Sequence, residues 1–209
     1  MARTYPINLL LKDRLCVVIG GGEVAARKVR SLADAEARVR VIAPEFCRSM
    51  QEISGQAGIE LIGKRFEPQD LDGAVLVIAS TDDETVNRSV YDQARIRGII
   101  VNVVDVPELC DFYVPSVVQR GDLTITISTG GLSPGVSREI RKRLEEVFGP
   151  EYAQYLQIVA NCRETIRKRY PEDPNQRMRI MNRILDLDLL SLIRNGQIQE
   201  AIEEADKCI

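Results

Sequence analysis

The chain has 209 residues with 28 basic and 31 acidic side chains, a formal net charge of -3 and 44% hydrophobic residues. This length suggests one principal domain with a smaller addition, and the balanced charge argues against general electrostatic binding of nucleic acid. No apolar run is long enough to span a bilayer. In the N-terminal stretch MARTYPINLLLKDR, the apolar segment is too short for a secretory signal and is interrupted too early by charged residues. We therefore expect a cytoplasmic protein without a membrane partner.

Short apolar runs alternate with helical patterns through the first half of the chain. Continuous apolar strands that alternate with helices predict a Rossmann-like parallel α/β sheet covered on both faces. The predicted strands are Leu15–Ile19, Val39–Ile42, Ile59–Ile62, Ala74–Ala79 and Ile99–Val104, and the predicted helices are Val24–Leu32, Phe46–Ile53 and Glu84–Arg97.

The pattern changes after Pro107. Tyr113–Val118 and Leu123–Ile127 flank a turn and predict an antiparallel hairpin, which is followed by a loop and a helix over Val136–Phe148. The rest is helical, with breaks at Tyr170-Pro171, near Pro174 and at Asn195-Gly196. We therefore expect a nucleotide-binding domain over residues 1–113, a small hairpin and helix region over 114–149 and a C-terminal helical domain over 150–209.

The turn after the first strand reads Gly20-Gly21-Gly22-Glu23-Val24-Ala25, which fits the pattern GxGxxA between a strand and a helix. Gly20 permits the tight turn, Gly22 lets a diphosphate approach the backbone, and Ala25 lets the helix pack closely. Free amides and the positive end of the helix favour phosphates. The placement predicts dinucleotide binding, and a purely structural turn is the alternative.

Two further strand ends border the predicted binding edge. The second strand ends at Ala43-Pro44, with neither a carboxylate for a ribose diol nor an arginine for a 2′-phosphate. We therefore prefer NAD to NADP, with the backbone at Ala43 and Pro44 contacting the adenosine. Thr81 and Asp82 follow the fourth strand, where they either border the cofactor or cap the next helix.

Asp105 follows the fifth strand at the same edge. The chain contains no histidine, which excludes an imidazole base, a Ser-His-Asp triad and a histidine metal ligand. Asp105 is therefore the leading candidate for general acid–base chemistry, and a surface aspartate in a turn is the alternative. The five cysteines are scattered without a CxxC pair, so we predict no metal site and no disulfide framework.

Several segments, taken in order, resemble one known family. They are Pro6, the Leu9–Arg14 lead-in, CVVIGGGEVAARKV, VIAP, ASTDDETVN, NVVDVPELCDFYVPS and STGGLSPGVSREIRKRLE. Together they cover about residues 5–148 and are similar to the precorrin-2 dehydrogenase and sirohydrochlorin ferrochelatase family, which is the dehydrogenase–chelatase module of siroheme synthase. The helical remainder resembles that family's C-terminal segment more weakly.

The resemblance implies a reaction and partners. In this family NAD accepts a hydride as precorrin-2, a tetrapyrrole, is oxidised to sirohydrochlorin, and some members then insert ferrous iron to give siroheme. Whether this chain only oxidises or also inserts ferrous or cobalt ion stays open. The family is a homodimer built through the hairpin and the helix that follows it, which implies that residues 114–149 form a dimerisation region.

The resemblance also implies roles for individual residues. Gly20, Gly22, Glu23, Val24, Ala43 and Pro44 take the NAD-contact positions, and Asp105 takes the position of the aspartate assigned to dehydrogenation, and to chelation in bifunctional members. Ser128, Thr129 and Gly130 correspond to a serine-rich loop near the substrate. Siroheme synthases carry a regulatory phosphoserine where Thr129 stands here, so that modification is not carried over.

A substrate with many carboxylates needs cations. Arg138 and Arg141 are three residues apart on one helix face and are candidates, whereas a solvated basic face is the alternative. A different function also fits a glycine turn and a parallel sheet, namely an NAD-sensing regulatory domain of the potassium-transport type. Such domains usually place an acidic residue at the second strand tip and have no use for Asp105 or the GGLSPG segment.

Overall fold

The computed structural model describes residues 4–209. Met1–Arg3 lie outside the described residues. These residues begin the predicted nucleotide-binding domain and the N-terminal stretch that we considered as a secretory signal. The chain divides into two compact units, Met1–Val114 and Pro115–Ile209. Among residues 4–209, no helix combines the length and the apolar character that crossing a membrane requires.

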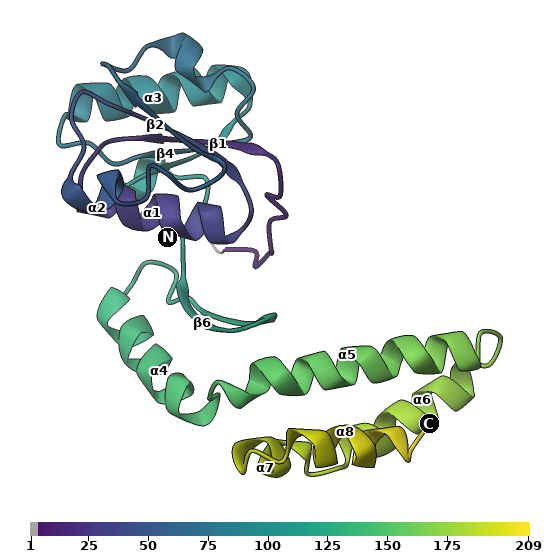
Figure 1. Cartoon of the computed structure of the whole chain (residues 1–209). Coiled ribbons are helices and arrows are strands. Elements are labelled where there is room, and N and C mark those ends of the chain that lie inside the picture. The colour runs from purple at the N-terminus through teal and green to yellow at the C-terminus, as the bar shows by residue number, and fades with distance from the viewer. Residues whose placement is uncertain (1–3) are drawn as a thin grey trace. The chain divides into compact units, whose positions relative to one another are not determined.

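The first unit is a parallel sheet with helices on both faces, which confirms the predicted Rossmann-like fold (Figure 1). Its five strands lie in the order β3-β2-β1-β4-β5. The strands are β1 (Leu15–Ile19), β2 (Arg38–Ala43), β3 (Ile59–Gly63), β4 (Leu76–Ala79) and β5 (Ile100–Val103). The helices are α1 (Glu23–Asp34), α2 (Arg48–Gln51) and α3 (Glu84–Arg97), with two 3-10 turns, η1 (Pro68–Leu71) and η2 (Pro107–Leu109).

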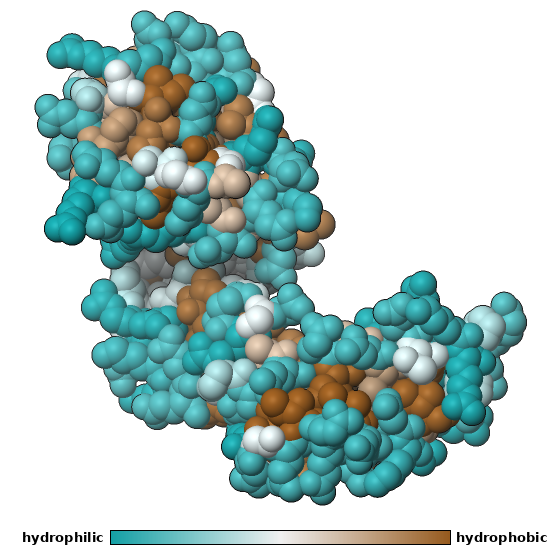
Figure 2. All heavy atoms as spheres, in the orientation of Figure 1, coloured by the Kyte–Doolittle hydropathy of each residue, from teal (hydrophilic) through white to brown (hydrophobic). Residues whose placement is uncertain are grey.

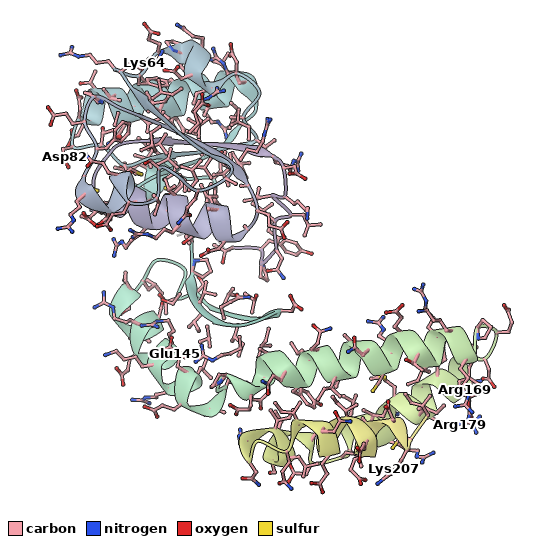
Figure 3. All side chains as sticks on the ribbon, viewed as in Figure 1. Lys64, Asp82, Glu145, Arg169, Arg179 and Lys207 are labelled. Carbon is pink, nitrogen blue, oxygen red and sulfur yellow. The ribbon has the colours of Figure 1, made fainter. Side chains whose placement is uncertain are left out.

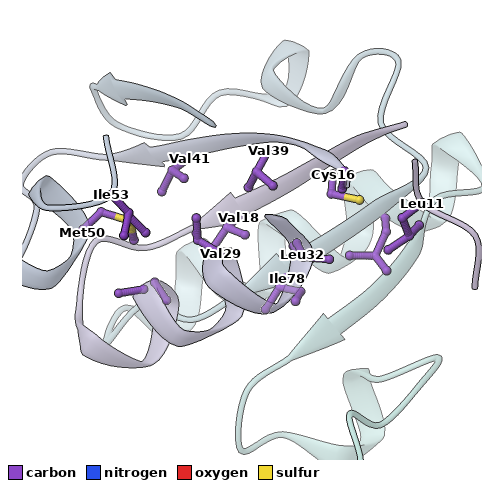
Figure 4. Packing of buried hydrophobic residues seen from close by; sticks show 14 residues of the cluster. Leu11, Cys16, Val18, Val29, Leu32, Val39, Val41, Met50, Ile53 and Ile78 are labelled. Carbon is purple, nitrogen blue, oxygen red and sulfur yellow. The ribbon is translucent and has the colours of Figure 1, made fainter. Parts of the chain in front are cut away.

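The alternation of side chains along each strand divides the core of this unit into two layers. Cys16 and Val18 of β1 pack in the layer that contains α1, with Val29 of that helix (Figure 4). Val17 and Ile19 pack in the layer that contains α3. Because both faces of the sheet are covered, the buried strands β1 and β4 read as continuous apolar runs in the sequence.

The direction of the chain across the sheet reverses between β1 and β4. The chain passes from β1 through β2 to β3 on one side, and then through β4 to β5 on the other. The last residues of the two central strands, Ile19 and Ala79, are paired in the parallel ladder. Open α/β sheets bind their ligands outside the carboxyl ends of the strands at such a reversal, so this edge is where a site is expected.

The second unit begins with the predicted hairpin and continues as five helices. Its elements are β6 (Ser116–Arg120), β7 (Leu123–Ile127), α4 (Pro134–Val147), α5 (Glu151–Arg169), α6 (Pro174–Leu185), α7 (Leu189–Arg194) and α8 (Ile198–Asp206). The four C-terminal helices enclose a separate core around Ile166, Ile184 and Leu189. Figure 2 shows hydrophobic residues gathered where α5 meets α7 and α8.

Some predicted boundaries were wrong. The strand predicted over Tyr113–Val118 runs instead over Ser116–Arg120, because Pro115 has no amide hydrogen to donate and Arg120 pairs with Leu123 across the turn. The helix predicted over Phe46–Ile53 is a single turn, Arg48–Gln51. The break before α7 was not predicted, and there the Asp188 carboxylate accepts a hydrogen bond from the amide of Ser191.

Candidate active site

Gly20 occupies a backbone position that only glycine fits easily. Its φ is 131°, and a Cβ placed there would lie 2.5 Å from the carbonyl oxygen of Ser80. The amide of Ser80 in turn donates to the carbonyl oxygen of Ile19 at 2.8 Å. The backbones at the ends of β1 and β4 therefore lie so close together that no side chain fits between them at Gly20. This steric restriction explains why the tight turn predicted there requires glycine.

Replacing Gly20 by alanine is expected to destabilise the first unit by about 1–3 kcal/mol, because the substitution combines a disfavoured φ with a backbone clash. Gly22→Ala is the matched control, since Gly22 has a φ of -84° and there is open space where its Cβ would lie. That control should lose less than about 1 kcal/mol. Hydrogen exchange of the β1 amides measures both changes, and equal losses in the two variants would contradict this explanation.

The N-terminus of α1 has no side-chain cap. Gly22 is the N-cap residue and supplies no acceptor for the amides of the first turn. Within residues 4–209, the amides of Gly21 and Gly22 donate no hydrogen bond. Val24, in the same turn, is 36% exposed although it is apolar. Uncapped amides at the positive end of a helix are an anion site that a diphosphate can occupy.

Glu23 opens α1, and its side chain reaches the neighbouring helix α2. The hydroxyl of Ser49 donates to Glu23 Oε1 at 3.0 Å. Hydrogen bonds from Ser49 and Cys47 lower the pKa of Glu23 below its ordinary value. The carboxylate is therefore ionised and restrained beside the glycine turn.

The segment after β2 closes one side of the turn. The amide of Cys47 donates to the carbonyl oxygen of Gly21 at 2.8 Å, and a Cβ on Gly21 would lie 1.9 Å from the carbonyl oxygen of Glu45. Ala43 is buried at the end of β2, whereas Pro44 is exposed next to it. The chain between Pro44 and Cys47 thus borders the turn. The sequence indicated Ala43 and Pro44 as residues near the site, but it did not indicate the contacts of Glu45 and Cys47 with the turn.

Thr81 and Asp82 lie just past β4 at the same edge. The Thr81 hydroxyl donates to Asn87 Oδ1 at 2.9 Å, and Asn87 Nδ2 donates back to the Thr81 carbonyl oxygen. The cap of α3 is Asp83, whose carboxylate accepts two amides of the first turn. Asp82 is exposed and makes no hydrogen bond within the described part of the chain (Figure 3). Of these residues, Asp82 is the one whose polar side chain is left for a ligand.

Asp105 follows β5, which is the second strand from β1 and its glycine turn. The amide of Val104 donates to the carbonyl oxygen of Ala79 at 2.9 Å, so the ladder between β4 and β5 continues up to this residue. Asp105 itself is exposed and has a left-handed φ of 63°. An aspartate in this conformation carries about 1 kcal/mol of strain, and strained residues are concentrated at functional sites.

The loop after Asp105 is tied back to β5. Asn102 is buried and its Nδ2 donates to the carbonyl oxygen of Phe112 at 2.8 Å. The amide of Asp111 donates to the carbonyl oxygen of Val101, and the amide of Val101 donates to the Asp111 carboxylate. Burial raises the pKa of the Cys110 thiol, which donates to the carbonyl oxygen of Val103. These bonds hold Asp105 at a fixed position on the sheet edge.

The loop between β7 and α4, in the second unit, is organised around Thr129. Its hydroxyl donates to the carbonyl oxygen of Ser133 at 3.1 Å, accepts the amide of Ser133, and lies 3.2 Å from the hydroxyl of the buried Ser137. Ser128 is exposed and its hydroxyl accepts the amide of Gly130. The side chain of Thr129 is therefore used in shaping the loop, whereas Ser128 is accessible.

The two predicted arginines on α4 differ in their surroundings. Arg141 is paired with Glu145 one turn further along the helix. Arg138 is exposed and forms no ion pair among residues 4–209. Of the two, Arg138 has the guanidinium that is free to bind a carboxylate.

The residues of the first unit fit a dinucleotide. The turn provides the open space at Gly22, the uncapped amides of α1 and the close passage at Gly20 that a diphosphate requires. In the described residues, no group of three or more histidine, cysteine or acidic side chains could hold a metal ion. The site is therefore that of a dinucleotide-binding α/β protein.

The comparison with known families agrees with this class. The family described as putative NAD(P)-binding matches residues 7–116, and the chain belongs to this family. Residues 120–146 match a second family, described as sirohaem biosynthesis protein central. The first match spans most of the first unit and ends two residues into the second, and the second match lies within the second unit.

Similar proteins extend this relationship. The siroheme synthase of Thioalkalivibrio sulfidiphilus is 40% identical over 205 residues, which are 98% of this chain and 42% of that protein. The siroheme synthase of Methylobacillus flagellatus is 43% identical over 175 residues, 84% of this chain and 38% of that protein. The chain thus spans less than half the length of these relatives. The solved structure of SirC, a precorrin-2 dehydrogenase, has a TM-score of 0.78 and 26% identity, and the match covers 98% of this chain and 100% of that one. These similarities confirm the resemblance drawn from the sequence.

Proposed function

We propose that this chain is an NAD-dependent oxidoreductase that converts precorrin-2 to sirohydrochlorin. One observation carries the proposal: the uncapped glycine turn and the strained Asp105 lie on the same carboxyl edge of one sheet, after β1 and after the second strand from it. The likeness to SirC, which covers 98% of this chain and 100% of that one, supports the choice of reaction. The siroheme synthase relatives support the same tetrapyrrole substrate class.

The oxidation removes one hydride and one proton from the macrocycle. When bound, the nicotinamide of NAD supplies the hydride acceptor. The amides of Gly22 and its neighbours bind the diphosphate, and the exposed Val24 contacts the cofactor beside them. Asp105 accepts the proton, since its carboxylate is exposed at the same edge and the chain has no histidine to do so.

The second unit contributes to substrate binding in this proposal. Arg138 holds a carboxylate of the tetrapyrrole by a charge-assisted hydrogen bond, while Arg141 stays paired with Glu145. Ser128, with its exposed hydroxyl, and the left-handed Gly130 form the loop at which the substrate is bound, and Thr129 keeps that loop in shape.

A cytoplasmic location stays a prediction from the sequence.

The activity is tested by mixing precorrin-2, NAD and the protein without oxygen and following the absorbance of sirohydrochlorin. We expect product to form faster than without protein, and only when NAD is present. A rate equal to that without protein would contradict the proposal and leave an NAD-sensing role. Insertion of ferrous or cobalt ion is tested separately with sirohydrochlorin and no NAD, where metallation at the uncatalysed rate restricts the protein to oxidation.

We further propose that the hairpin and α4 form a homodimer interface. Val136, Ile140 and Val147 lie on one face of α4 and are 50%, 37% and 58% exposed. Val117 of the hairpin is exposed as well. An apolar stripe on a helix that follows a two-stranded sheet is typical of a surface covered by a partner.

Ile140→Asp is expected to raise the dimer dissociation constant by about 100-fold or more, because a buried unpaired carboxylate opposes association. Ala160→Asp, which adds the same charge to an exposed position of α5, is the control and should leave the dimer intact. Sedimentation equilibrium measures both. A monomeric unsubstituted protein, or an Ile140→Asp dimer as tight as the original, would contradict the interface.

A further inference from the structure

Lys28 is a half-buried cation on α1 for which the described residues offer no ion pair. Ala25 and Leu32, on the same side of the helix, are buried against the sheet. Neither Lys28 nor its neighbour Arg27 forms a salt bridge with an acidic side chain in residues 4–209. Cations that lose part of their hydration are ordinarily paired, so this arrangement leaves a positive charge available to an anion.

Within residues 4–209, the carboxylate of Asp105 is an acidic group whose charge raises the pKa of Lys28. Burial lowers the pKa of Lys28, the positive charge of Arg27 lowers it further, and the carboxylate of Asp105 opposes both effects. No ion pair joins Lys28 to Asp105 within the described structure, so the two charges do not neutralise each other directly. The Lys28 ammonium can bind a carboxylate of a ligand, while the Asp105 carboxylate can accept a proton from the same ligand.

The position of Lys28 separates it from the diphosphate site. Lys28 lies about 8 Å further along the helix axis than Glu23, beyond the first-turn amides. The residue before Asp105, Val104, packs in the same core layer as Ala25 of α1. Lys28 and Asp105 therefore belong to the same side of the first unit, next to the cofactor turn and not within it.

We propose that Lys28 is a further substrate-binding residue, which holds a carboxylate of the substrate beside Asp105. This inference rests on the proposed function, because the substrate class is a tetrapyrrole with several carboxylates. A lysine ammonium binds an anion as a compact charge on a flexible stem and can adjust to the carboxylate as the macrocycle binds. The interaction fixes which part of the ring faces the Asp105 carboxylate.

The first test measures binding without turnover. Lysines of the complete chain are acetylated with acetic anhydride, with and without sirohydrochlorin, and each site is quantified by mass spectrometry. We expect saturating sirohydrochlorin to slow modification of Lys28 by about 10-fold and to leave Lys12, an exposed lysine paired with Glu36, unchanged. Unchanged modification of Lys28, or protection of Lys28 by NAD alone, would overturn the inference.

The second test separates substrate binding from positioning of Asp105. Lys28→Met keeps the apolar stem and removes the charge, and should raise KM for precorrin-2 about 10-fold with less than about a 3-fold change in kcat and no change in NAD affinity. Lys28→Arg keeps the charge and should restore most of the loss. A fall in kcat at unchanged KM would overturn the inference, because Lys28 would then act on Asp105 alone.

The two hypotheses fail in different ways. If the unsubstituted protein does not oxidise precorrin-2, the proposed function is wrong whatever happens at Lys28. If it oxidises precorrin-2 but sirohydrochlorin leaves Lys28 as reactive as before, only the inference about Lys28 is wrong.

Discussion

Gly22→Asp is expected to weaken NAD binding by about 100-fold or more, which corresponds to about 2.8 kcal/mol, without destabilising the protein. Aspartate is a favourable N-cap residue, and its carboxylate would accept the first-turn amides that the diphosphate uses in our proposal. It would also repel the phosphates. Isothermal titration with NAD measures the affinity, and hydrogen exchange of the α1 amides measures stability.

The combination of outcomes makes this variant informative. Gly22→Asn caps the helix without the charge and should weaken NAD less than aspartate does. Gln197→Asp places an aspartate at the N-cap of α8, in the other unit, and should leave NAD affinity unchanged. If Gly22→Asp bound NAD normally, the glycine turn would be purely structural, which is the alternative to dinucleotide binding that the sequence left open.

Asp105→Asn is expected to lower kcat for precorrin-2 oxidation by about 100-fold to 10000-fold, because the amide cannot accept the proton. Asparagine tolerates the left-handed backbone that Asp105 adopts, so the fold and the NAD affinity should be retained. Single-turnover measurements without oxygen report this step directly.

Glu108→Gln is the matched control for this substitution. Glu108 is an exposed carboxylate in the same loop, three residues further on, and is not part of the proposed site. Its replacement should leave kcat within about 3-fold of the original. If Asp105→Asn turned over at a near-normal rate, another group or water would be the proton acceptor.

The fold was predictable where local pattern and burial agree. β1, β4 and β5 are almost entirely buried, so their continuous apolar runs indicated their positions. β2 and the partly exposed edge strand β3 were indicated only by shorter apolar stretches. The glycine turn could be placed because it needs a strand before it and a helix after it. The start of β6 was misplaced, since the apolar Tyr113 and Val114 read as strand although the residue that follows them is Pro115.

The surroundings of the site depend on contacts between distant residues and were not predictable. Nothing near Glu23 in the sequence indicates that Ser49 holds its carboxylate. The approach of Ser80 to Gly20 follows from the order of the strands. In the sequence, Lys28 is one of several basic residues on the side of the predicted helix expected to face solvent. Only the packing of α1 against the sheet shows that Lys28 is half-buried, unlike the exposed Arg27.

The most direct test of the proposed function is a crystal structure of the protein with NAD bound. We expect the diphosphate to contact the amides at Gly21 and Gly22, and the nicotinamide to lie on the side of Asp105. A dinucleotide bound elsewhere on the chain, or a diphosphate at the turn with the nicotinamide directed away from Asp105, would contradict it.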